Sequence, residues 1–187
     1  MSTAEEIKKN AIYLISRYGF DSVSMRQLAR ATDIHTGSIY AHYKNKNDIL
    51  NELLTDHMEN LILTWHDKKK SLRDPKILLT VFIEVYINHY YHHREESIIV
   101  SLDMRSLNAH EKEEINRLKE IYENELIKVL KTGTIAGSFN VDDYQLTSTV
   151  LMSILSGVCS TYCNHVSYNQ KYIFDRVLLL AEDLLKA

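Results

Sequence analysis

Residues 24–46 read SMRQLARATDIHTGSIYAHYKNK, and this stretch holds the start and stop signals of two short helices. Ser24 stands three residues before Gln27, which is the spacing of a capping box at the start of a helix. The residues that follow predict a short helix that ends near Thr32.

A tight turn separates this helix from the next one. Residues 32–35 are too few and too polar to form an element, and Asp33 tolerates the left-handed backbone that such a turn requires. A second short helix is expected from about Thr36 to Tyr43. Upstream, apolar residues recur at helical spacing from Ile7 to Tyr18, with Gly19 in the position of a left-handed C-cap. A supporting helix followed by two short helices is the layout of a helix-turn-helix.

The second short helix carries side chains suited to DNA. Those expected to face outward are short or form hydrogen bonds: Thr36, Ser38, Tyr40 and His42. Gly37 allows close approach of the backbone, and Ile39 either touches a thymine methyl or anchors the helix. Lys46 and Arg26, near the starts of two helices, add charge for phosphates. The alternative is a helical hairpin with no role in nucleic-acid binding.

The distribution of charge divides the chain in two. Residues 1–46 carry seven Lys and Arg against four Asp and Glu, whereas residues 47–187 carry 15 against 21. A basic head on an acidic body suggests that only the head meets a polyanion. We therefore expect a DNA-binding domain over residues 1–46 and a second domain over residues 47–187.

The rest of the chain is expected to be helical, because it has few helix breakers. The whole sequence contains one proline and five glycines. Asn45 and Asp48 form a cap-like pair, and Asp74 precedes Pro75, which is a strong helix start. The predicted helices run from this first pair toward residue 70 and over residues 75–94, 95–106, 109–131, 142–165 and 168–185, with a turn at residues 133–139. The fold class is all-α, with about nine helices and no strands.

The head resembles the tetracycline-repressor family of transcription regulators. The resemblance lies in residues 24–29 (SMRQLA), in residues 37–43 (GSIYAHY), and in Lys46 and Leu50, at the family's spacing. It implies that Met25, Arg26, Thr36, Ser38, Tyr40, His42 and Lys46 face DNA, mostly at phosphates, while Leu28, Ala29 and Ile34 hold the head together.

Two residues of the turn depart from the family's pattern. The family usually has glycine where Asp33 stands and a serine or similar cap where His35 stands. We therefore expect a somewhat strained turn and a second short helix that is less well capped. Neither departure removes an expected DNA contact.

The resemblance implies that the second domain forms a homodimer through its last two helices and holds a small molecule. One predicted buried stripe consists of Leu146, Val150, Ile154, Val158 and Cys159, beside the small residues Ser148, Ser153, Ser156 and Gly157. The last helix carries Ile173, Val177, Leu180, Leu184 and Leu185. The core of a monomer could use the same residues. In a dimer, recognition helices roughly 34 Å apart would read a nearly palindromic operator.

Candidate ligand-binding residues are mostly aromatic. Tyr86, Tyr90, Tyr122 and Tyr162 suit a cavity because tyrosine has apolar faces and a polar tip, although ordinary helix packing explains them as well. The segment LDMRSL at residues 102–107 resembles members that sense acyl-coenzyme A thioesters, which suggests that Arg105 meets a phosphate or thioester. A surface ion pair is the alternative for Arg105.

Two further pairs have the spacing of a helix face. His89 and His93 are four residues apart, but no third metal ligand is evident, so we expect no metal site. Cys159 and Cys163 lie in an apolar stretch and are interpreted as core residues, not as a redox pair.

These features predict a ligand-responsive DNA-binding regulator, most simply a repressor that a small molecule releases from its operator. We find no phosphate-binding glycine loop, nucleophile elbow or paired metal motif, so we expect neither an enzyme nor a cofactor. The start of the chain lacks a signal-peptide layout and no apolar run is long enough to span a membrane, which predicts a cytoplasmic protein. A helical binding protein that has lost DNA binding is the remaining alternative. The sequence leaves open the effector, the operator and the choice between repression and activation.

Overall fold

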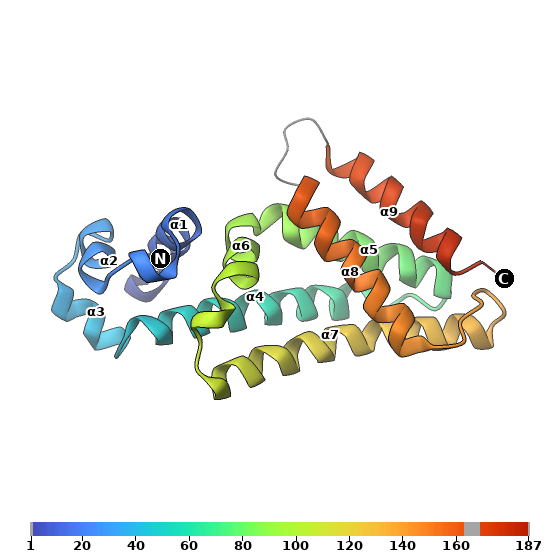
Figure 1. The fold of residues 1–187 in the computed structure, drawn as a ribbon, viewed down its shortest axis with the longest axis horizontal. Helices are drawn as coiled ribbons and strands as arrows, with labels where there is room; N and C mark the ends of the chain where they lie inside the picture. The colour runs from blue at the N-terminus through green and yellow to red at the C-terminus, as the bar shows by residue number, and fades with distance from the viewer. Residues whose placement is uncertain (1, 163–168, 187) are drawn as a thin grey trace. The chain divides into compact units, whose positions relative to one another are not determined.

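A computed structural model describes residues 2–162 and 169–186 of the chain, and all regular structure in these ranges is helical (Figure 1). The nine α-helices found there are α1 (Thr3–Tyr18), α2 (Met25–Ala31), α3 (Thr36–His42), α4 (Lys46–Lys69), α5 (Pro75–His92), α6 (Arg94–Leu102), α7 (Ala109–Ile135), α8 (Tyr144–Tyr162) and α9 (Gln170–Leu184). Two short 3-10 helices, η1 (Phe20–Ser22) and η2 (Met104–Ser106), complete the set. The predicted all-α fold is confirmed.

The chain folds into two compact units. The first comprises Met1–Met58 and His93–Arg117, and the second comprises Glu59–His92 and Leu118–Ala187. Helices α4 and α7 each continue from one unit into the other. The first unit contains α1, α2 and α3 and also takes in α6, so it is larger than the expected head. The division between residues 46 and 47 stays a prediction.

In the first unit, α1 packs against α2 and α6, and α2 packs against α3. Ion pairs tie α1 to the first half of α4, because the Lys8 Nζ lies 2.9 Å from a Glu52 carboxylate oxygen and 2.7 Å from one of Asp56. Burial alone would lower the pKa of Lys8, but the two carboxylates raise it above its ordinary value. The start of α4 is fixed further by the predicted pair, since Asn45 Oδ1 accepts from the Asp48 amide at 3.0 Å.

In the second unit, α5 packs against both α8 and α9, which also pack against each other (Figure 1). Glu125 of α7 is buried and accepts hydrogen bonds from Trp65, Lys69 and Lys128. Burial alone would raise the pKa of Glu125, but these donors lower it to about 2. Within the described ranges, no helix combines the length and the apolar composition that crossing a membrane requires.

Helix α7 continues past the predicted end at residue 131, which corrects the expected turn at residues 133–139. Gly133 lies inside the helix, and a Cβ at this position would overlap the ring of the buried Phe139. The helix ends at Ile135, and the turn that follows contains Gly137, whose φ of 69° is the left-handed conformation that glycine adopts readily. Gly133 therefore acts as a packing site for Phe139 and not as a turn residue.

The helix expected over residues 95–106 is shorter and is followed by a separate 3-10 turn. Helix α6 ends at Leu102, with the buried Asp103 as its C-cap. Helix α5 already ends at His92, so His93 lies outside it and serves as the N-cap of α6. His89 and His93 therefore do not share a helix face, because the helix that was expected to carry both is interrupted.

The buried faces of α8 and α9 differ from the predicted stripes. In α8 the buried residues are Ser148, Leu151, Leu155 and Cys159, and in α9 they are Ile173, Val177 and Ala181. Leu146 and Leu180, which belong to the predicted apolar stripes, are 61% and 53% exposed in the single chain. Both helices carry apolar residues on two adjacent faces, and the chain's own core covers only one of them, so burial of the other face in a dimer stays a prediction. Cys163 lies outside the described residues.

Candidate functional site

The start of α2 has the predicted capping box. Ser24 Oγ accepts a hydrogen bond from the Gln27 amide at 3.3 Å, and Gln27 Oε1 accepts one from the Ser24 amide at 2.7 Å. This arrangement satisfies amide hydrogens that a helix start leaves without helical partners. The capping box fixes where α2 begins, and therefore which side of the helix carries the side chain of Arg26.

The turn between α2 and α3 has the conformation that the sequence suggested. Asp33 has a φ of 54°, in the left-handed region, and among the described residues it alone adopts a positive φ without being glycine. The Ile34 amide donates to the Ala29 carbonyl at 3.0 Å, which closes the turn. His35 is the N-cap of α3 and makes no side-chain capping bond, so the expectation of a less well capped α3 is confirmed.

Helix α3 presents one side to the interior and the other to solvent. Ile39 is completely buried, whereas Tyr40 is 53% exposed. Gly37, Ser38 and His42 are also exposed, and Thr36 is half-buried. A short helix held by one buried anchor thus exposes a row of small and hydrogen-bonding side chains.

Met25 and Ile39 need a correction as expected DNA contacts. Met25 is only 8% exposed and Ile39 is fully buried, because both pack into the core of the first unit. For Ile39 the structure favours the anchoring role. We leave both side chains out of the proposed DNA contacts, while the DNA roles of the other expected residues stay predictions.

Lys46 is held in place by Phe20. Its Nζ donates to the Phe20 carbonyl at 2.5 Å and lies 4.0 Å from the centre of the Phe20 ring. The Phe20 amide in turn donates to Asp103 Oδ1 at 3.3 Å. Burial lowers the pKa of Lys46, while the charges of Asp21 and Asp103 oppose that shift. The contacts that Phe20 and Asp103 make here were not predicted, because no local sequence pattern links residues so far apart in the chain.

A second feature that the sequence analysis missed lies beside the turn. Arg26, Arg30, Asp33, His35 and Thr36 all line a polar surface pocket of about 510 Å³ that also includes Ala29 and Ile34. Arg30 stands four residues after Arg26 on the same face of α2, and this spacing was the available signal.

In the second unit, the candidate tyrosines are only partly brought together. The rings of Tyr86 and Tyr122 have centroids 6.2 Å apart, and Tyr122 stacks on Phe82 at 4.6 Å. Tyr90 is buried on the same helix as Tyr86, and the thiol of the buried Cys159 lies close enough to influence the Tyr86 hydroxyl. Burial, with smaller contributions from these neighbours, raises the pKa of Tyr86.

The other two candidates differ in their surroundings. Tyr162 is 41% exposed and forms the last residue of α8 as described. Arg105 is exposed in η2 and belongs to the first unit. Neither residue lines the cavity of the second unit. Their ligand-binding roles stay predictions.

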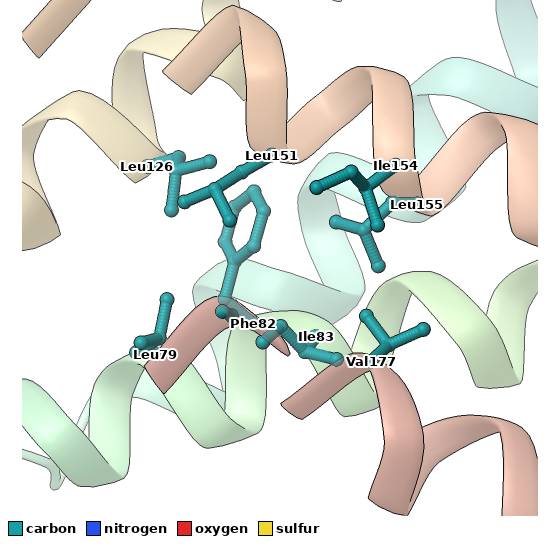
Figure 2. Close-up of a pocket in the computed structure, with 9 residues that line it drawn as sticks. Leu79, Phe82, Ile83, Leu126, Leu151, Ile154, Leu155 and Val177 are labelled. Atoms are coloured by element: carbon teal, nitrogen blue, oxygen red, sulfur yellow. The ribbon is translucent and has the colours of Figure 1, made fainter. Parts of the chain in front are cut away.

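A small apolar cavity lies between α5, α7, α8 and α9 (Figure 2). Its walls are formed by Leu79, Phe82, Ile83, Leu126, Leu151, Ile154, Leu155, Val177 and Ala181. Figure 2 shows the ring of Phe82 extending toward Leu126 and Leu151. The volume is about 10 Å³, at the lower limit for a single water, and the walls offer a water no partner. Among the described residues, no three His, Cys, Asp or Glu side chains form a group that could hold a metal ion.

Comparison with known families gives two matches along the chain. Residues 7–53 match the family described as bacterial regulatory proteins, tetR family. Residues 74–165 match the tetracyclin repressor-like C-terminal domain. The first match covers α2 and α3, and the second covers the helices that line the cavity up to α8.

Two curated relatives share about a quarter of the aligned residues with the chain. The fatty acid metabolism regulator protein of Bacillus subtilis is 24% identical over 163 residues, which is 87% of this chain and 82% of that protein. The negative transcriptional regulator IcaR of the biofilm operon icaADBC in Staphylococcus epidermidis is 25% identical over 175 residues, covering 90% and 86%.

Solved structures have the same fold. A tetR-family regulatory protein from Rhodococcus RHA1 superposes with a TM-score of 0.92 at 18% identity, covering 100% of this chain and 98% of that one. FadR from Bacillus subtilis, solved in complex with stearoyl-CoA, gives 0.84 at 22% identity and covers 97% and 99%. AibR, solved with isovaleryl coenzyme A and operator DNA, gives 0.86 at 17% identity and covers 96% and 97%.

Proposed function

Because the chain belongs to the tetR family of bacterial regulatory proteins, we propose that it is a repressor whose α2 and α3 hold operator DNA until an effector releases it. The observation that carries this proposal is that α3 has one buried face and one exposed polar face. Its buried anchor Ile39 fixes the helix, and its exposed face carries Ser38, Tyr40 and His42. Such a helix can enter the major groove while the rest of the head grips the backbone.

The proposed contacts are mainly with phosphates. Hydroxyl and imidazole groups of α3 donate to phosphate oxygens, and Arg26 and Lys46 add positive charge. The bond from Lys46 to the Phe20 carbonyl uses one of the three donors of its ammonium group, so the others remain for a phosphate. We add Arg30 to this set, because it lines the same pocket as Arg26, His35 and Thr36.

The protein is proposed to act as a homodimer through α8 and α9. The outer faces of these helices expose Leu146, Val150, Leu179, Leu180 and Leu184. Large apolar patches on soluble proteins usually mark a contact with another molecule. The small residues Ser153 and Gly157 lie exposed on α8 and allow close approach of a second copy. Dimerisation presents two α3 helices to a nearly palindromic operator.

The effector is proposed to be an acyl-coenzyme A thioester or a similar lipid-type molecule. A cavity walled only by aliphatic and aromatic side chains suits an acyl chain. Since the cavity holds only about 10 Å³, the surrounding helices have to separate when a chain enters. An effector that binds only the opened state shifts the protein away from the conformation that binds DNA, by as much as its affinities for the two states differ.

We further infer that the protein acts in the cytoplasm and catalyses no reaction. This inference is supported by the relatives, which are transcription regulators, and by the absence of a known catalytic motif in the sequence. Cofactors and metal ions play no part in the proposed mechanism.

The test is a gel-shift assay of the full chain against the DNA upstream of its own gene, repeated at several salt concentrations. Specific retention that weakens steeply with salt is expected, because cations leave the phosphates when the protein binds. Lys46→Ala is expected to weaken binding to most sequences alike and to reduce the salt slope by about 0.9.

The matched control for this variant is Lys76→Ala, which removes an exposed lysine from the second unit and is expected to leave both affinity and slope unchanged. No retention of operator-like DNA at low salt would overturn the proposal. Full affinity of Lys46→Ala would remove Lys46 from the proposed contacts.

A further inference from the structure

The hydroxyl group of Tyr122 is buried without a hydrogen-bond partner. Tyr122 lies on α7 and is 1% exposed, and no acceptor or donor for its hydroxyl exists among the described residues. A buried polar group in this state destabilises the folded chain, so nearly all such groups in proteins are paired. The unpaired hydroxyl therefore needs an explanation.

Neighbouring aromatic residues show that the second unit can pair such groups. Trp65 is equally buried, and its indole nitrogen donates to Glu125 Oε2 at 3.0 Å. In the first unit, the buried Tyr43 has the Glu52 carboxylate as its hydroxyl's partner. Tyr122 differs from both because its hydroxyl has no partner within the described ranges. A phenylalanine at this position would fill the same space without burying an unpaired hydroxyl.

The position of Tyr122 connects it to the apolar cavity. Its ring stacks on Phe82 with centroids 4.6 Å apart and planes 24° apart. Phe82 in turn forms part of the cavity wall (Figure 2). The cavity wall itself contains only aliphatic and aromatic side chains, so Tyr122, which stacks on the wall residue Phe82, carries a buried donor of a kind that the wall lacks.

The hydroxyl keeps its proton under all ordinary conditions. Burial raises the pKa of Tyr122 well above its ordinary value, and the nearby Tyr86 adds to this effect. A neutral phenol can donate one hydrogen bond, and a carbonyl oxygen is a suitable acceptor for it.

We propose that the Tyr122 hydroxyl donates a hydrogen bond to the carbonyl oxygen of an acyl thioester whose hydrocarbon chain occupies the cavity beside Phe82. This inference rests on the proposed effector class and names the atom that recognises it. One donor beside an apolar cavity matches a ligand with one acceptor at the end of an apolar chain. The energy that the free protein loses by leaving the hydroxyl unpaired is recovered when the ligand binds.

The first experiment needs no ligand. Tyr122→Phe is expected to raise the melting temperature of the free protein, because it removes only the unpaired hydroxyl. Tyr43→Phe is the matched control and is expected to lower the melting temperature, because it removes a paired hydroxyl. A melting temperature for Tyr122→Phe that falls like that of Tyr43→Phe would overturn the inference, because the hydroxyl would then stabilise the free fold.

The second experiment compares palmitoyl-CoA with S-hexadecyl-CoA, the thioether in which a methylene replaces the carbonyl. Calorimetry on the full chain is expected to give roughly tenfold tighter binding of the thioester to the native protein, the size of one hydrogen bond. Tyr122→Phe is expected to bind both compounds with the affinity that the native protein has for the thioether. Only a hydroxyl that touches the carbonyl predicts that the preference disappears in this variant.

The results separate the two proposals. Equal binding of both compounds by the native protein, or an unchanged preference in Tyr122→Phe, would overturn the role of Tyr122 while supporting the effector class. Binding of neither compound would overturn the proposed effector class and this inference with it. The proposed DNA binding would remain, since the gel-shift assay tests it independently.

Discussion

The outer face of α3 and the outer faces of α8 and α9 are built from opposite kinds of side chain. Helix α3 exposes Ser38, Tyr40 and His42 above a fully buried Ile39. The pair of long helices exposes leucines and a valine above its own buried stripe, with Leu180 more than half exposed.

This difference indicates what each surface contacts. Polar side chains that stay hydrated in the free protein can exchange water for phosphate oxygens at little cost. Exposed leucines gain only when another apolar surface covers them, at about 25 cal/mol per Å². One surface is therefore suited to a charged, hydrated partner, and the other to a second copy of the chain.

The largest expected effect is that of salt. Between 50 mM and 200 mM salt, operator affinity is expected to fall roughly a thousandfold, as for proteins with about six phosphate contacts. Over the same range the dimer is expected to stay intact, because burial of apolar surface does not depend on counterions. Gel shifts and light scattering measure the two responses. A dimer that dissociated in parallel with the DNA complex would contradict the assignment of the two surfaces.

The next effect comes from placing a charge on the apolar surface. Leu180→Glu is expected to give a monomer and to weaken operator binding roughly 100-fold, because the two heads no longer bind as a linked pair. Size-exclusion chromatography with light scattering and the gel shift give the two readouts. Leu63→Glu is the matched control, since Leu63 is 64% exposed but lies on α4, and it is expected to leave the dimer intact.

A smaller effect is expected from the polar surface. Tyr40→Ala is predicted to weaken binding roughly tenfold on operator and unrelated DNA alike, as the loss of a phosphate contact does. Fluorescence anisotropy with both DNAs measures it. Tyr13→Ala removes an exposed tyrosine of α1 and should change neither affinity. Loss confined to the operator would instead assign Tyr40 to base reading.

The smallest effect concerns the turn. Asp33→Asn removes one negative charge beside Arg26 and Arg30 and keeps a residue type that accepts the φ of 54°. Affinity for DNA is expected to rise about two- to threefold, equivalent to roughly 0.5 kcal/mol of screened repulsion. Anisotropy titrations at low salt resolve a change of this size, and a decrease would indicate that Asp33 itself contacts the operator.

The parts of the fold that depend on neighbouring residues were predictable from the sequence. The capping box of Ser24 and Gln27 and the left-handed Asp33 follow from side chains within a few residues of each other. Their chemistry acts locally, so tertiary packing did not override it.

Features set by contacts across the fold were not predictable. Glycine is typical of turns, but Gly133 lies inside α7, and the Phe139 ring packs where a side chain of residue 133 would be. In α8, Leu146 and Leu155 lie on different apolar faces, and only the packing of α8 on α5 decides that the face of Leu155 is the buried one. Periodicity identifies an apolar face but does not identify what covers it.

In the candidate site, too, some features follow from the local sequence and others only from contacts across the fold. The exposed residues of α3 were predicted correctly as outward-facing, whereas Met25 was expected to face outward and is buried. The two bonds that link Asp103 through Phe20 to Lys46 join residues 83 and 26 positions apart, so no local pattern could indicate them. The missing partner of the Tyr122 hydroxyl likewise emerges only from the folded core.

The small volume of the cavity, about 10 Å³, also sets a time scale. An effector cannot enter until the helices around Phe82 separate, so its association includes a step of the protein alone. The rate of operator release should therefore rise with effector concentration at first and then level off at the rate of opening. Stopped-flow measurements would give this limiting rate, which sets how quickly transcription can follow a rise in the effector.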